Sequence, residues 1–265
     1  MGFNCGIIGM PNVGKSTLFN ALTKTSQAEA ANYPFCTIEP NTGRVAVPDK
    51  RLDELAQIAQ SAKIIYSQLE FVDIAGLVRD ASKGEGLGNQ FLGHIREVDA
   101  IAHVLRCFED ENITHVEGTI DPIRDLEIIE TELLLADIES LEKQKISLEK
   151  KARGNEKEAK SKLSLIEKMY TKMSNGIPAR KIDTLNIEER SLMLSLGLIT
   201  IKPMLYVCNL SEDDIIEGNA FSTAVLEKAK SESCGYTFVS AQIEQELSLL
   251  DEKERTEYLS VSYTH

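Results

Sequence analysis

The sequence predicts an α/β protein with a mainly parallel sheet and an inserted antiparallel pair of helices. Three observations support this fold class. Short apolar runs alternate with stretches of helical periodicity, the order expected of a βα sheet. A glycine-rich loop joins the first apolar run to the first helical stretch. A long segment, from about residue 131 to 193, repeats apolar residues at four–three spacing, and strand-like runs lie on both sides of it.

The expected strands are short runs rich in apolar and β-branched residues. They are Phe3–Ile8, Leu69–Ile74, Ala100–Cys107, Pro203–Cys208 and Tyr236–Val239, with Arg44–Val47 as a further edge strand. Helices are expected at Lys15–Thr23, Arg51–Gln60, Asn89–Val98 and Thr223–Lys230. Strands that alternate with helices in this way form parallel sheets with helices on their faces.

The inserted segment has the pattern of an antiparallel coiled-coil hairpin. Its first half places Leu134, Ile138, Leu141, Lys145, Leu148 and Ala152 at alternating spacings of four and three. After an interruption at 153–155, the second half resumes the spacing with Ala159, Leu163, Ile166, Tyr170, Met173 and Ile177. The turn is expected near Gly154. We therefore expect a nucleotide-binding domain at 1–130 and 201–265, interrupted by a helical insertion at 131–200.

Composition and charge limit the classes of function. The 265 residues are 42% hydrophobic, enough for a substantial core, and the net charge of −13 argues against indiscriminate nucleic-acid binding. Between Lys143 and Lys181, however, twelve Lys or Arg stand against four Glu. This local basic face is compatible with docking to structured RNA, and equally with a solvated helical surface.

The cysteines and the apolar runs indicate a cytoplasmic protein. The five cysteines are scattered without close pairs, so no zinc or redox spacing appears and reduced thiols are expected. No apolar run reaches about 18 residues, and the N-terminus lacks a signal-peptide pattern.

A phosphate-binding loop is the strongest motif. Residues 9–16 read G-M-P-N-V-G-K-S, which matches G-x-x-x-x-G-K-[ST] between an expected strand and an expected helix. In such loops the backbone N–H groups and the helix N-terminus cradle phosphates. Lys15 is expected to reach the β- and γ-phosphates, and the Ser16 hydroxyl to bind Mg²⁺. The expected nucleotide contacts of this segment are Asn12, Val13, Gly14, Lys15, Ser16 and Thr17.

A second acidic motif supports a nucleoside triphosphate site. Residues 73–76 read D-I-A-G at the end of an expected strand. Asp73 is placed to hold Mg²⁺, usually through water, and the Gly76 N–H to touch the γ-phosphate. Thr37, in the loop between the two motifs, is the expected second hydroxyl ligand of Mg²⁺, with an ordinary loop threonine as the alternative.

Longer motifs resemble the YchF/Obg-like ATPase family of P-loop NTPases. They are N-Y-P-F-C-T-I-E-P-N at 32–41, D-I-A-G-L-V at 73–78, S-K-G-E-G-L-G-N-Q-F-L at 82–92 and F-E-D-E-N-I-T-H-V-E-G at 108–118. The resemblance runs from Met1 to about Leu259. It implies a nucleotide-binding domain with an inserted coiled-coil hairpin, Mg²⁺-dependent ATP hydrolysis, and binding to the large ribosomal subunit as a translation- or stress-linked switch.

The same resemblance implies rRNA as a contact of the basic hairpin. Neither DNA nor a membrane is expected as a partner, the membrane because no long apolar run is present. Members of the family continue with a further helix and then a TGS domain. Residues 259–265 resemble neither of these.

Base choice depends on the segment after the fourth long strand. GTPases of this class carry N-K-x-D there, whereas residues 209–212 read N-L-S-E. Leu210 replaces the lysine, and Glu212 is one methylene longer than aspartate. Losing the paired hydrogen bonds to guanine is worth about 1–3 kcal/mol. We expect adenine, held by Asn209 and backbone groups around Leu210, with Ser240 and Ala241 supporting the base. A GTPase that tolerates Glu212 is the alternative.

The hydrolytic machinery is less specified. Leu77 stands where many GTPases place a glutamine that orients water, so positioning must come from elsewhere. His115 is one candidate, with a surface or structural role as the alternative. Asn12 is another, because an asparagine there helps to hold a K⁺ ion in related NTPases. Slow basal turnover is expected, with residues 84–88 as a switch. A non-hydrolysing, ATP-dependent binding module is the remaining alternative.

Overall fold

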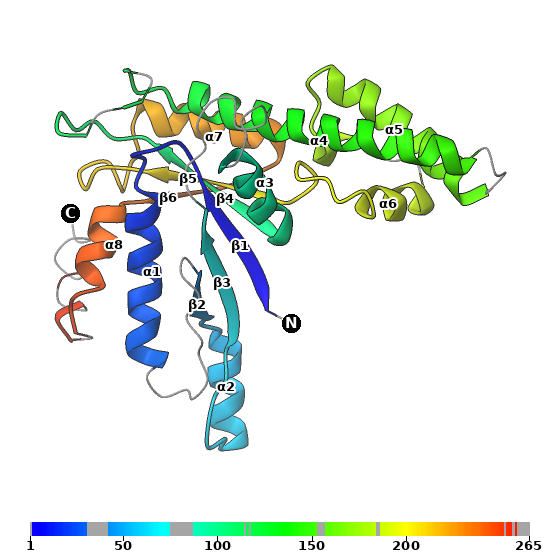
Figure 1. Ribbon diagram of the computed structural model, residues 1–265. Helices are drawn as coiled ribbons and strands as arrows, with labels where there is room; N and C mark the ends of the chain where they lie inside the picture. Colours follow the sequence, from blue (N-terminus) through cyan, green and yellow to red (C-terminus); the bar gives the residue numbers. More distant parts are fainter. Residues whose placement is uncertain are drawn as a thin grey trace.

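A six-stranded sheet with helices on both faces forms the body of the computed structural model (Figure 1). The structure describes residues 2–30, 42–74, 87–113, 115–116, 118–152, 157–183, 186–251, 253–255 and 258. The strands are β1 (Phe3–Ile8), β2 (Thr42–Val47), β3 (Ser67–Asp73), β4 (Ala100–Arg106), β5 (Met204–Asn209) and β6 (Gly235–Val239). Their order is β2-β3-β1-β4-β5-β6, with β2 antiparallel and all other pairs parallel. The predicted fold class is confirmed.

Helices cover both faces of this sheet. The helices of the described residues are α1 (Lys15–Ala30), α2 (Lys50–Ala59), α3 (Leu87–Glu97), α4 (Pro122–Ala152), α5 (Lys157–Ser174), α6 (Ile187–Leu194), α7 (Ala220–Glu232) and α8 (Ala241–Leu247), with a 3₁₀ turn, η1, at Ala179–Lys181. Helices α5 and α6 lie away from the sheet, in the insertion. Helices α1 and α8 lie side by side on one face (Figure 1), whereas α3, α4 and α7 lie on the other. Within the described residues, no helix is long and apolar enough to cross a membrane.

Two helices were not expected, α6 and α8. Ser240 begins α8, because its side chain accepts a hydrogen bond from the Ile243 N–H. Asn219 caps α7 in the same manner: its side chain accepts from the Ser222 N–H, and its own N–H donates to the Ser222 hydroxyl.

The largest difference from the expected elements concerns the start of α4. This helix begins at Pro122, so the boundary expected at 130/131 falls inside it. The Asp121 carboxylate accepts hydrogen bonds from the N–H groups of Ile123 and Arg124, and proline suits the first helical position because its missing N–H would have no helical partner.

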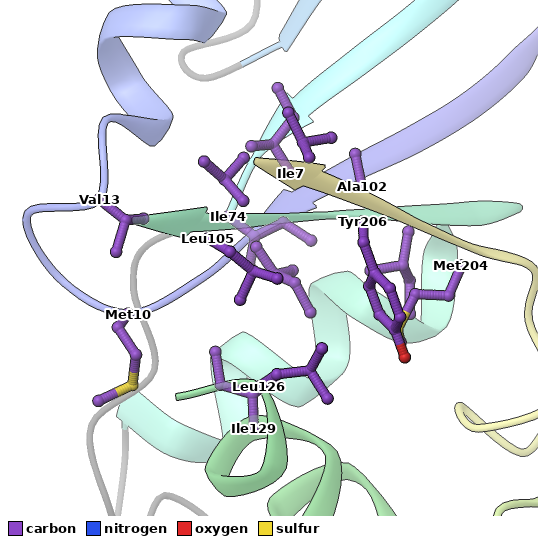
Figure 2. Close-up of a cluster of buried hydrophobic side chains, with 14 of the residues drawn as sticks. Ile7, Met10, Val13, Ile74, Ala102, Leu105, Leu126, Ile129, Met204 and Tyr206 are labelled. Atoms are coloured by element: carbon purple, nitrogen blue, oxygen red, sulfur yellow. The ribbon is translucent and has the colours of Figure 1, made fainter. Parts of the chain in front are cut away.

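The first half of α4 belongs to the core of the sheet. Leu126, Ile129 and Leu133 are fully buried on α4 and pack with side chains of the strands. Figure 2 shows Leu126 and Ile129 on the side of the sheet from which Tyr206 projects. A second core lies farther along α4, between it, α5 and the segment that returns to β5. Its most buried members are Leu141, Ile166, Met169, Met173 and Ala179, which are fully buried.

The four–three spacing locates much of this second core, although the expected Ala159 and Leu163 are not among its members. Leu141, Ile166 and Met173 are buried in it as expected. Ile177, however, lies beyond the end of α5 and is 38% exposed, so its expected place in the seam is wrong. Helix α5 ends at Ser174, and Gly176 turns the chain with a φ of 84°. The turn expected near Gly154 lies outside the described residues.

Candidate functional site

The carboxyl ends of the parallel strands meet at one edge of the sheet and bring the predicted site together. The register pairs Ile7 of β1 with Asp73 of β3, and Asn209 of β5 with Val239 of β6. The glycine-rich loop leaves β1 at this edge and leads into α1. Ligands of open α/β sheets bind at the carboxyl ends of the strands. This edge is therefore the candidate site.

Two glycines of the loop are required by close backbone approaches. Gly9 has a φ of 154°, and a Cβ there would lie 2.4 Å from the Val104 carbonyl oxygen. Gly14 has a φ of 94°, and a Cβ there would lie 2.3 Å from Nδ2 of Asn209. The loop thus rests directly on β4 and on the end of β5, a separation that only glycine allows.

Lys15 is folded back into its own loop. Its side chain is buried, and Nζ donates a 2.7 Å hydrogen bond to the Met10 carbonyl oxygen. Burial lowers the pKa of Lys15 to about 8, and the nearby Asp73 carboxylate opposes this shift. Within the described residues the ammonium group thus donates to one carbonyl oxygen at a place where it is poorly solvated, which favours its transfer to an anion such as a phosphate.

Ser16 and Asp73 form the candidate Mg²⁺ ligands. The Ser16 hydroxyl donates a 2.9 Å hydrogen bond to Oδ2 of Asp73. Oδ1 of Asp73 is buried and has no hydrogen-bond partner within the described part of the chain. A buried carboxylate oxygen without a donor is costly unless something else satisfies it. A hydroxyl and a carboxylate oxygen are the ligands that Mg²⁺ prefers, so these residues fit the ion.

Asn209 joins the phosphate loop to the loop before α8. Its Nδ2 donates to the Val13 carbonyl oxygen at 2.9 Å, and its Oδ1 accepts from the Ala241 N–H at 2.9 Å. The side chain is buried. The structure therefore gives Asn209 a role in holding two loops together, and the expected contact between Asn209 and a base stays a prediction.

The other expected base-site residues surround this junction. Leu210 is buried in the main core, and its N–H donates to the Val239 carbonyl oxygen at 2.8 Å. Ser240 and Ala241 are buried beside it, whereas the Glu212 side chain is exposed. Four of the remaining expected contacts lie in the loop and at the start of α1: Asn12, Val13, Gly14 and Thr17. The others lie outside the described residues: Thr37, Gly76, Leu77 and residues 84–86.

His115 is placed differently from a water-exposed catalytic base. Its Nε2 lies 2.8 Å from Oδ2 of Asp125, and both side chains are buried. Arg124 lies 3.3 Å from the other oxygen of Asp125. This pair ties the loop after β4 to the first turn of α4, which is the geometry of a structural histidine. A direct role of His115 in hydrolysis stays a prediction.

Sequence reasoning missed two buried polar residues of β4. Arg106 donates to the carbonyl oxygens of Phe108, Asp110 and Ile113 and so shapes the loop after the strand. His103 is fully buried, and in the part of the chain that is described neither of its ring nitrogens has a hydrogen-bond partner. Burial lowers the pKa of His103 to about 3, so the ring is neutral. A polar residue inside an apolar strand was the available signal for both.

Known proteins resemble this chain over almost its whole length. Residues 4–135 match the family described as 50S ribosome-binding GTPase. A protein of Haemophilus influenzae named ribosome-binding ATPase YchF is 52% identical over 98% of this chain and 70% of its own length. The protein of that name from Bacillus subtilis is 47% identical over 98% of this chain and 71% of its own.

A solved structure agrees with these relatives. The structure of the Schizosaccharomyces pombe YchF GTPase superposes with a TM-score of 0.86 and 40% identity, over 99% of this chain and 72% of that one. Identity and fold therefore agree over the strands, the phosphate loop and the helical insertion. The chain belongs to the YchF family.

Proposed function

We propose that this chain is a cytoplasmic, Mg²⁺-dependent ATPase that acts on the ribosome as a nucleotide-controlled switch. The observation that carries the proposal is the convergence of Lys15, Ser16 and Asp73 at the loop edge of the sheet, with one carboxylate oxygen of Asp73 still lacking a partner among the described residues. The names of the bacterial relatives supply ATP as the nucleotide and the ribosome as the partner.

Each of the three side chains has a distinct role in this proposal. Lys15 exchanges the Met10 carbonyl oxygen for the β- and γ-phosphates, where its positive charge offsets the charge that develops on the leaving group. Ser16 and Asp73 would hold Mg²⁺. When bound, Mg²⁺ neutralises charge on the β- and γ-phosphate oxygens. Backbone N–H groups of the loop orient the phosphates.

Base selectivity is tested by calorimetric titration with ATP and with GTP in Mg²⁺ and K⁺ buffer. Leu210 stands in place of the lysine and Glu212 is one methylene longer than aspartate, so we expect ATP to bind at least tenfold more tightly than GTP. The variant Leu210→Lys with Glu212→Asp should then move the preference toward GTP. A native preference for GTP would support the GTPase alternative, consistent with the name of the yeast protein. Binding of neither nucleotide would reject the proposal.

Hydrolysis is tested by single-turnover measurements with and without K⁺. If Asn12 helps to hold K⁺ near the phosphates, replacing K⁺ by Na⁺ should slow the reaction. His115→Ala separates the two roles of the histidine: full turnover in a folded variant would end the catalytic hypothesis. No turnover under any condition, with ATP still bound, would favour the non-hydrolysing binding module.

The hairpin is the proposed contact with the large ribosomal subunit and its rRNA. Part of its positive charge is already paired, since Lys143 contacts Glu139, Lys145 contacts Glu167 and Lys168 contacts Glu189. Lys143→Glu with Lys150→Glu should weaken cosedimentation with the large subunit and leave ATP affinity unchanged.

The matched control for this pair of substitutions is Lys50→Glu with Lys63→Glu, which changes net charge equally at and after α2. Equal pelleting of the hairpin variant and the wild-type chain would count against the hairpin as the contact.

A further inference from the structure

The end of α3 is held by a side chain from the segment that precedes β5. Nζ of Lys202 donates to the carbonyl oxygen of Arg96 at 3.1 Å and also to that of Val98. The last carbonyl groups of a helix have no partner within the helix, so a lysine that binds them acts as a cap. Its positive charge also interacts favourably with the negative end of the helix dipole. Lys202 therefore attaches the start of β5 to the end of α3.

Two residues before Lys202, the same segment is attached to the middle of α4. Asp137 is fully buried and accepts hydrogen bonds from the Ile199 N–H at 2.8 Å and the Thr200 N–H at 2.7 Å. The Thr200 hydroxyl donates to the same carboxylate at 2.7 Å. The Lys202 N–H closes the turn on the Ile199 carbonyl oxygen at 3.1 Å. Residues 199–202 thus form a turn with α3 bound at one end and α4 at the other.

Charges at this junction interact with one another. Burial raises the pKa of Asp137, while its backbone donors and the nearby Arg96 favour the ionised form. Burial lowers the pKa of Lys202, while Asp99 and Asp137 oppose that shift. A partly desolvated group with specific partners has few alternative arrangements of similar energy, because each alternative leaves a charge or a backbone group unpaired. Residues 199–202 are therefore held to both α3 and α4 by bonds that each have few substitutes.

Helix α3 is the element through which nucleotide would act. It begins at Leu87, downstream of Asp73 and the D-x-x-G segment whose homologous parts in GTPases are ordered by the γ-phosphate. Helix α4 continues without interruption from the sheet core into the hairpin core. We propose that Lys202 and Asp137 are positioning residues that couple the nucleotide state of the phosphate site to the orientation of the helical hairpin. The inference rests on the proposed nucleotide binding.

Hydrogen exchange of the Ile199 and Thr200 amides tests the coupling, because both amides bind Asp137 directly. Exchange is measured on the whole chain with ADP and with a non-hydrolysable ATP analogue, each with Mg²⁺. We expect the two nucleotides to change the exchange rates by about fivefold or more relative to each other, the lower end of allosteric coupling. In Lys202→Met the ratio should fall to about one, and Lys202→Arg, which keeps a donor, should restore it.

Lys168→Met is the matched control, since it removes a 2.7 Å ion pair with Glu189 in the hairpin and touches no part of α3. It should keep the wild-type ratio. Should Lys202→Met not fold, Asp137→Asn replaces it, because the amide keeps the volume and loses one acceptor. A ratio of one in the wild-type chain, with binding shown by calorimetry, overturns the coupling alone. A ratio that persists in the variants also overturns it. Absence of binding overturns both the coupling and the proposed function.

Discussion

The loop edge of the sheet and the helical hairpin use polar side chains in opposite ways. At the edge, Lys15, Arg106 and Asn209 are buried, and each bonds to backbone groups of a loop. In the hairpin, apart from the buried Asp137 at its base, Lys143 and Lys168 lie on the surface in ion pairs while apolar residues fill the core. Loop shape at the edge thus depends on single hydrogen bonds, whereas the hairpin depends on apolar burial. Substitutions in the two regions should therefore fail in different measurements.

The largest effect is expected at Lys15. Lys15→Met removes the charge that would meet the phosphates, and loss of one such group costs about 10²- to 10³-fold in turnover. Among the described residues only the Met10 carbonyl oxygen loses a donor from Lys15, so the variant should stay folded. Single-turnover hydrolysis measures the loss, and circular dichroism checks the fold. Turnover within tenfold of the wild-type rate would show that hydrolysis does not depend on Lys15 at the loop edge.

In the hairpin, the corresponding test is Met169→Ala. The side chain is fully buried in the second core, and truncations of this kind cost about 2–5 kcal/mol of unfolding free energy. Urea unfolding measures this loss. Ile146→Ala, at a residue 59% exposed on the same hairpin, should change stability by less than about 0.5 kcal/mol. Nucleotide affinity should be unchanged in Ile146→Ala, and a drop in that surface variant would contradict this expectation.

Lys15 should also give the nucleotide-free chain a characteristic pH dependence. Its folded pKa of about 8 lies below the ordinary value of 10.5, so between these pH values the unfolded chain binds more protons and stability rises with pH. Each pKa unit corresponds to about 1.4 kcal/mol, which limits the rise to about 3 kcal/mol. Comparing urea unfolding of wild-type and Lys15→Met chains from pH 7 to 10.5 isolates this contribution. If the unfolding free energies of the two chains changed in parallel with pH, Lys15 would not be the source of the rise.

A smaller effect is expected when the donor of Asn209 is removed. In Asn209→Asp the carboxylate still accepts from the Ala241 N–H but cannot donate to the Val13 carbonyl oxygen. The unpaired Val13 carbonyl oxygen costs about 1–3 kcal/mol, the new buried charge adds to that cost, and ATP affinity should fall because the loop loses its support. Asn175→Asp is the control, since it removes an exposed amide bond to the Thr171 carbonyl at the end of α5. Equal effects at the two sites would contradict the role of burial.

The smallest effect is expected for a surface ion pair of the hairpin. Lys168→Met breaks the contact with Glu189, and exposed pairs contribute about 0.2–1 kcal/mol. The difference between wild-type and variant unfolding free energies should shrink further in about 1 M salt, because salt screens the pair. A loss above about 2 kcal/mol would mean that surface charge, and not apolar burial, holds the hairpin together.

The sequence was sufficient for the fold class, the phosphate loop and most of the hairpin core, because these depend on local patterns. A strand, a glycine-rich turn and a helix are adjacent in the chain, and the buried Leu141, Ile166 and Met173 repeat at helical spacing. The bonds of Asn209 and Asp137 could not be predicted in this way. Asn209 meets Val13 across 196 positions, and Asp137 meets Thr200 across 63. Which distant backbone group satisfies a side chain is decided by the packed fold.

The uninterrupted course of α4 makes the hairpin sensitive to helix phase. The helix has 31 residues and, at about 1.5 Å per residue, extends over about 46 Å without a linker. One residue inserted between Leu133 and Leu141 would rotate everything beyond it by about 100°, and would turn the second core away from its partners. Insertions of seven residues, close to two whole turns, would nearly keep the direction and lengthen the arm by about 10 Å. The helical hairpin of this protein can therefore vary in length only in steps set by the helical repeat.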